Sequence, residues 1–175
     1  MKYLRRFAVF AAKKLVLFTL GASLLIYAFY LCFNIANAYI IVSEGMEKRV
    51  DVCLTRDDYV SLNDYFTVEY LNNDPVLAAA VSEASPYYPF EIKSYDYDIK
   101  LSSLRWSPRK NCVTCTATEY VTAISGSVKA AYASSVSGSV PSWSSGRYIV
   151  TLQKTDGRWK ISSLQQDYSY KDVES

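Results

Sequence analysis

An uninterrupted apolar run near the N-terminus is the feature that most constrains this chain. Residues 15–33 carry no charged side chain, and they follow five basic residues, Lys2, Arg5, Arg6, Lys13 and Lys14. At about 1.5 Å of rise per residue, the run extended to Ala38 crosses the roughly 30 Å hydrocarbon core of a bilayer. Basic residues on one side favour a cytoplasmic N-terminus. We therefore expect a cytoplasmic segment 1–14, a membrane helix 15–38, and the rest of the chain outside the cytoplasm.

A cleaved secretory signal is the alternative. Ala36-Asn37-Ala38 has the small-x-small pattern of a cleavage site, and a basic segment precedes the apolar run. An h-region usually has about 7–15 apolar residues, and this run is longer. The retained anchor in the cell membrane is therefore the prediction, and cleavage after Ala38 stays open.

The composition narrows the functions available to the rest of the chain. Beyond Lys14, 14 basic residues stand against 17 acidic residues, a net charge of −3. Without a basic stripe to neutralise phosphates, we expect no nucleic-acid partner. The chain has no histidine, which removes Ser-His and Cys-His nucleophile pairs and most zinc sites. We expect one domain of about 130 residues, no metal, no cofactor and no enzymatic activity.

Helical periodicity comes first along the chain. Residues 43–54 contain one apolar stripe, formed by Met46, Val50, Cys53 and Leu54. The stripe predicts a juxtamembrane helix over residues 39–55, with Arg49 on its polar side. Thr55 is expected to cap a second helix, and Asp74 followed by proline a third.

Strand periodicity follows the helices. Residues 95–101 alternate, and Phe90 and Ile92 lie in the opposite phase, so a bulge is expected near Ser94. A second strand is predicted over residues 112–124, ending at a turn.

The last predicted hairpin joins residues 148–152 to residues 159–164 across Thr155-Asp156-Gly157. Helices followed by strands predict an α+β domain over residues 56–165, with helices packed on a curved antiparallel sheet. A polar tail is expected over residues 166–175.

This order, closed by Asp156-Gly157-Arg158-Trp159-Lys160-Ile161, resembles the nuclear transport factor 2-like superfamily. The resemblance covers residues 43–164 and implies a cone-like fold. One membrane helix before such a domain is similar to the scaffold subunits of bacterial conjugation and type IV secretion machines. That similarity implies contact with membrane lipid and with other membrane or cell-envelope proteins, is compatible with a homo-oligomer, and transfers no site residue.

The cysteines are interpreted as structural. Cys53 lies on the helical stripe, and Cys115 shares its strand phase with Val113, so both are expected to face the core while Cys112 does not. Cys53 and Cys115 are therefore a candidate disulfide in an oxidising compartment. A redox or metal site at Cys112 and Cys115 is disfavoured, because residues i and i+3 of a strand are about 10 Å apart on opposite faces.

Two further residues carry the functional hypotheses. Trp143, within a serine-rich loop, is expected to be exposed and to contact a partner. Glu119 shares its strand phase with apolar residues; if it points inward, burial would raise its pKa and make it a candidate acid or base. Asp96 and Asp98 are expected to face solvent.

The favoured function is a membrane-anchored, extracytoplasmic scaffold or protein-binding module. The alternative is a small-ligand or glycan-binding module that uses an aromatic-lined cone, and an enzyme built around Glu119 comes third. A large apolar pocket with convergent polar groups would favour the last two. An exposed aromatic patch would favour the scaffold.

Overall fold

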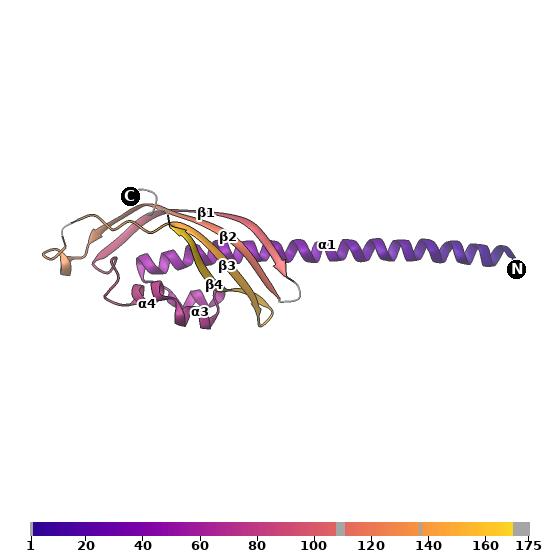
Figure 1. Ribbon diagram of the computed structural model, residues 1–175, viewed down its shortest axis with the longest axis horizontal. Helices are drawn as coiled ribbons and strands as arrows, with labels where there is room; N and C mark the ends of the chain where they lie inside the picture. Colours follow the sequence, from indigo (N-terminus) through magenta and orange to yellow (C-terminus); the bar gives the residue numbers. More distant parts are fainter. Residues whose placement is uncertain (1, 108–110, 137, 170–175) are drawn as a thin grey trace. The chain divides into compact units, whose positions relative to one another are not determined.

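A computed structural model describes residues 2–107, 111–136 and 138–169 of the 175-residue chain (Figure 1). The chain divides into two compact units, Met1–Asn37 and Ala38–Ser175. Helix α1, Lys2–Thr55, contributes to both. By length and composition α1 is able to cross a membrane, and none of its most apolar window is buried. The N-terminal apolar helix expected from the sequence is therefore present.

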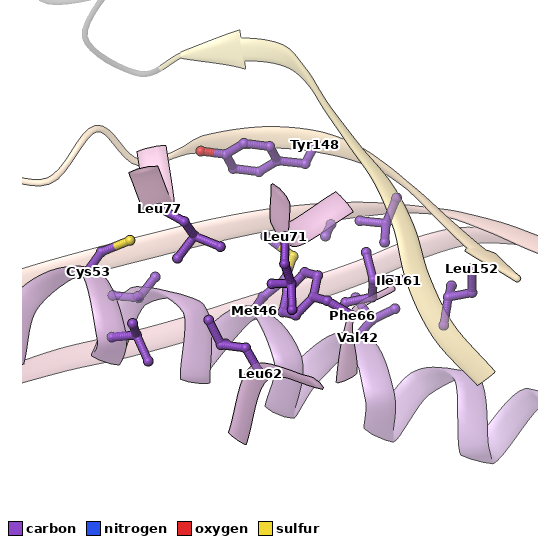
Figure 2. Packing of buried hydrophobic residues seen from close by; sticks show 14 of the residues in the cluster. Val42, Met46, Cys53, Leu62, Phe66, Leu71, Leu77, Tyr148, Leu152 and Ile161 are labelled. Atoms are coloured by element: carbon purple, nitrogen blue, oxygen red, sulfur yellow. The ribbon is translucent and has the colours of Figure 1, made fainter. Parts of the chain in front are cut away.

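In the second unit, the last part of α1 is the central helix of the core. Its buried residues follow a helical spacing: Ala38, Val42, Met46, Val50 and Cys53. Residues 39–55, expected as a separate juxtamembrane helix, thus belong to the packed domain. The reason is that their apolar stripe lies against the sheet and the short helices, and Figure 2 shows Val42 and Met46 beside Phe66.

Short helices follow α1: η1 (Tyr59–Ser61), α2 (Leu62–Tyr65), α3 (Val68–Asn73) and α4 (Pro75–Val81). The prediction that Thr55 caps a second helix is wrong. Thr55 ends α1, and the chain then turns through Arg56 and Asp58, which have φ angles of 68° and 53°. The prediction for Asp74 is confirmed, since its carboxylate accepts hydrogen bonds from the first backbone N–H groups of α4.

Four strands complete the domain: β1 (Phe90–Ser107), β2 (Cys112–Val128), β3 (Gly146–Thr155) and β4 (Arg158–Ser169). They form one antiparallel sheet in the order β1-β2-β3-β4, which lies over the end of α1 (Figure 1). The α+β class is confirmed. The sheet is open and neither closed nor strongly curled, so it is flatter than the cone that the resemblance implies. Four strands are too few to close around a filled interior.

The bulge predicted in β1 is present, whereas the turn predicted within β2 is not. The bulge near Ser94 is confirmed by register shifts on both sides of that residue. The turn expected after residue 124 is wrong, because β2 continues to Val128 and Gly126 pairs with Ile92. A side chain at Gly126 would come within 2.5 Å of the Glu91 carbonyl oxygen, so glycine permits the close pairing.

The C-terminal hairpin forms as predicted around Asp156 and Gly157. Its second strand is longer than expected. β4 extends to Ser169, which pairs with Gly146, because backbone hydrogen bonds in a ladder do not require apolar side chains. The polar tail predicted for residues 166–175 is therefore partly strand, and residues 170–175 lie outside the described part of the chain.

Candidate functional site

A cavity of about 700 Å³ lies within the second unit, between α1, α4, β3, β4 and the loop before β3. Its volume falls in the range of small-molecule binding sites. The wall is mainly apolar, with an aromatic side and a polar end. The lining residues that matter below are Arg49, Cys53, Tyr70, Asp74, Ala79, Tyr87, Trp143 and Tyr148.

The polar end is built around a buried ion pair. Arg49 Nε donates to Asp74 Oδ2 at 2.8 Å, and Arg49 Nη2 donates to Asp74 Oδ1 at 3.3 Å. The Tyr70 hydroxyl donates to Asp74 Oδ2 at 2.6 Å. Burial alone would raise the pKa of Asp74, but the hydrogen bond and the charge of Arg49 outweigh burial and hold that pKa below its usual range. The pair is therefore fully ionised and mutually neutralised at neutral pH.

Sequence reasoning missed this ion pair because it assigned Arg49 to the polar side of its helix. Arg49 is 4% exposed and lies on the buried stripe. The signal was present, since Met46, Arg49 and Val50 have the i, i+3, i+4 spacing of one helix face. A charge on that face requires a buried partner. Asp74 is that partner, and because it also caps α4, the ion pair joins α1 to α4.

The aromatic side of the cavity is formed by Trp143 and Tyr87, whose rings stack with centroids 6.2 Å apart. The Tyr87 hydroxyl donates to the Ser142 carbonyl oxygen, so the loop is attached at a second point. The prediction that Trp143 is exposed is wrong, because only 9% of the residue is exposed. Its indole N–H donates to Glu119 Oε1 at 2.8 Å, an acceptor that holds the ring inside the domain.

Glu119 points inward and is completely buried. Burial raises the pKa of Glu119, against the opposing effects of the Trp143 hydrogen bond and the Arg49 charge. Its second oxygen, Oε2, has no hydrogen-bond partner among the described residues. Glu119 does not line the cavity; it lies behind Trp143 and anchors that ring.

Tyr148, on β3, is one of the residues that line the cavity. It is 8% exposed, and Figure 2 shows its ring above the core with the hydroxyl at the end nearest Leu77. The hydroxyl makes no hydrogen bond within the part of the chain that the structure describes. Burial raises the pKa of Tyr148 to about 12, so at neutral pH the hydroxyl keeps its proton and can both donate and accept.

The cysteines lie as their patterns predict, but the expected bridge is not formed. Cys53 and Cys115 are buried, Cys112 is half-buried, and all three are free thiols. Cys53 lies close enough to Glu119 for that carboxylate to affect its thiol pKa. Cys115 lies on β2 four residues from Glu119, which is about 13 Å along the strand. The two thiols therefore lie beside different parts of β2 and do not form a disulfide. Burial raises the thiol pKa to about 12 for Cys53 and to about 11 for Cys115, so neither is a ready nucleophile.

The remaining acidic candidates are on the outside. Asp96 and Asp98 are exposed on β1, as expected. Within the described ranges, no group of three or more cysteine, aspartate or glutamate side chains is placed to hold a metal ion. The arrangement is thus a cavity with an apolar wall, stacked aromatic rings, a neutralised ion pair and one unengaged tyrosine hydroxyl.

No protein family model and no curated protein matches the chain. Among solved structures, the Kfla4162 protein from Kribbella flavida aligns with 77% of this chain and 92% of its own, at a TM-score of 0.47 and 15% identity.

Proposed function

We propose that this chain is a membrane-anchored module that binds a small molecule in the cavity between α1, α4 and Trp143. The observation that carries the proposal is the cavity itself, about 700 Å³ with Arg49, Asp74, Tyr70 and Tyr148 converging on a mainly apolar space. Apolar walls supply affinity, and a few placed polar groups supply orientation. The proposal includes membership of the nuclear transport factor 2-like superfamily, which is supported by the order of helices followed by an antiparallel sheet.

Binding is favoured over the scaffold function because of Trp143. The scaffold hypothesis relied on an exposed aromatic for partner contact. Trp143 is instead buried, stacked on Tyr87 and bonded to Glu119. It is therefore a wall of the cavity rather than an anchor for a partner protein.

Binding is also favoured over catalysis. An acid or base must reach the atom from which it moves a proton. Glu119 is separated from the cavity by Trp143, and its Oε1 already accepts the indole N–H. The thiol of Cys53 does line the cavity, but its pKa is raised to about 12 by burial. These two groups support positioning and shape rather than chemistry.

The membrane anchor is the second part of the proposal. No residue of the most apolar window of α1 is buried, and the basic residues before it favour a cytoplasmic N-terminus. Ala38 is completely buried in the core of the second unit. Cleavage after Ala38 would remove a core residue, which supports a retained, single-pass anchor with the cavity outside the cytoplasm.

A fragment screen on the full chain in lipid nanodiscs tests the binding proposal. Ala79 is exposed and lines the cavity, whereas Ala78, beside it on α4, is exposed and does not. Saturation-transfer NMR should detect fragments bound to wild type and to Ala78→Trp, and Ala79→Trp should weaken or lose them because the indole takes up part of the cavity. Fragments that bind equally to Ala79→Trp, or a screen without bound fragments, would contradict the proposal.

A further inference from the structure

We infer that the ligand is an uncharged, largely apolar ring compound that carries one hydrogen-bonding oxygen, an inference that rests on the proposed binding function. Three properties of the lining lead to it: its charge balance, its aromatic rings and its one unengaged tyrosine hydroxyl.

The charge balance excludes ionic ligands. Among the described lining residues, Arg49 and Asp74 are the only ones with a full charge at neutral pH, and they neutralise each other at 2.8 Å. Asp74 also accepts from the Tyr70 hydroxyl and from two backbone N–H groups of α4. A charged ligand would enter a mainly apolar space without a counter-charge, or would have to separate this pair, and both are costly.

Glu119, which contacts Trp143 but does not line the cavity, does not change this charge balance. Burial raises the pKa of Glu119, which favours its neutral form, and its Oε1 is engaged by Trp143. A cationic ligand therefore finds no free carboxylate among the described residues that line the cavity.

The ring faces favour a flat, apolar ligand. Trp143 and Tyr87 line one side and are held in place by hydrogen bonds to Glu119 and to the Ser142 carbonyl. The lining also includes the aliphatic side chains of Pro75, Val76, Ala79 and Ala80. A ring compound gains aromatic contact with the two rings and apolar burial against the aliphatic side chains.

The oxygen follows from comparing the three tyrosines that line the cavity. The Tyr70 hydroxyl donates to Asp74, and the Tyr87 hydroxyl donates to Ser142 O. The Tyr148 hydroxyl has no partner in the described structure, although its residue is 8% exposed. The hydroxyl oxygen keeps solvent-accessible surface on the cavity lining, so a ligand that supplies a carbonyl or hydroxyl oxygen replaces water there with a direct hydrogen bond.

A matched series of naphthalene compounds tests the inference by calorimetry on the full chain in nanodiscs, with empty nanodiscs as the blank. Naphthol is neutral with an oxygen, naphthalene lacks the oxygen, naphthoate is an anion and naphthylmethylammonium is a cation. Naphthol should bind at least about tenfold more tightly than either ion. Tyr148→Phe should weaken naphthol about tenfold and leave naphthalene unchanged. Tyr132→Phe, outside the cavity, is the matched control.

The outcomes separate the two proposals. Naphthoate or naphthylmethylammonium binding as tightly as naphthol, with loss in Ala79→Trp, would overturn the neutral-ligand inference and leave the binding function standing. Equal naphthol affinity in wild type and Tyr148→Phe would overturn the assigned role of the hydroxyl. Absence of binding by every member of the series would count against the cavity as a binding site and so against both proposals.

Discussion

At the scale of single residues, Glu119 has the most unusual environment in the domain. Its side chain is completely buried, with one oxygen bonded to Trp143 and the other unpartnered among the described residues. Burial raises its pKa above the ordinary value of 4.5, so the folded protein binds this proton more tightly than the unfolded chain. Between the two pKa values, the free energy of unfolding therefore falls as pH rises.

Glu119→Gln tests that environment. Glutamine keeps an oxygen to accept the Trp143 N–H and removes the titration. We expect the variant to lack part of the pH dependence seen in wild type, with the difference growing by up to about 1.4 kcal/mol per pH unit within the window. Chemical denaturation at a series of pH values above 4.5 measures it. Asp98→Asn, an exposed change on β1, is the control; parallel curves for wild type and Glu119→Gln would contradict the account.

At the scale of elements, Asp74 joins α4 to α1. It caps α4 and neutralises Arg49, and the two side chains are 2% and 5% exposed. Asp74→Asn keeps a capping oxygen but leaves Arg49 as an uncompensated buried charge, so the free energy of unfolding should fall by about 3–5 kcal/mol. Thr67→Ala, which removes the side-chain cap of α3, should cost about 1 kcal/mol.

A double variant distinguishes the two roles of Asp74. Combining Asp74→Asn with Arg49→Met removes both charges. The double variant should be more stable than Asp74→Asn alone. Urea denaturation of the four proteins gives the coupling free energy. Additive losses would mean that the ion pair contributes nothing beyond the cap.

Close packing of α1 against α2 is a second feature at this scale. An added Cβ at Gly45 would lie 2.9 Å from Tyr65 Cβ and 3.1 Å from Ile161 Cδ1. Alanine is the better helix former, but the overlap should dominate, so Gly45→Ala should lower the free energy of unfolding by about 1–3 kcal/mol. Gly21→Ala meets no atom within 4 Å and is the control. A higher melting temperature for Gly45→Ala would contradict this expectation, because it would show that α2 and β4 shift enough to accommodate the added methyl group.

What the sequence could predict at this scale depended on how local the signal was. The bulge at Ser94, the cap at Asp74 and the hairpin at Gly157 follow from period and turn chemistry within a few residues. The burial of Arg49 and Trp143 depends on partners 25 and 24 residues away, Asp74 and Glu119. No local pattern contains those pairings, so the cavity they form was not readable from the sequence.

At the scale of the whole molecule, the proposal places the cavity outside the cytoplasm. In a chain whose native cysteines are replaced by alanine, Asp156→Cys in the last hairpin should react with a membrane-impermeant maleimide on intact cells. Lys13→Cys should react only after permeabilisation. A purified protein that begins at Tyr39 would show that the anchor is removed.

The central claim is that the cavity holds a small molecule, and native mass spectrometry of the full chain extracted from membranes tests it most directly. Wild type and Ala78→Trp should carry a bound small molecule that remains after gentle removal of detergent and is lost in Ala79→Trp, because only the latter side chain lines the cavity. Adduct-free masses for all three proteins, or the same adduct on Ala79→Trp, would contradict the claim.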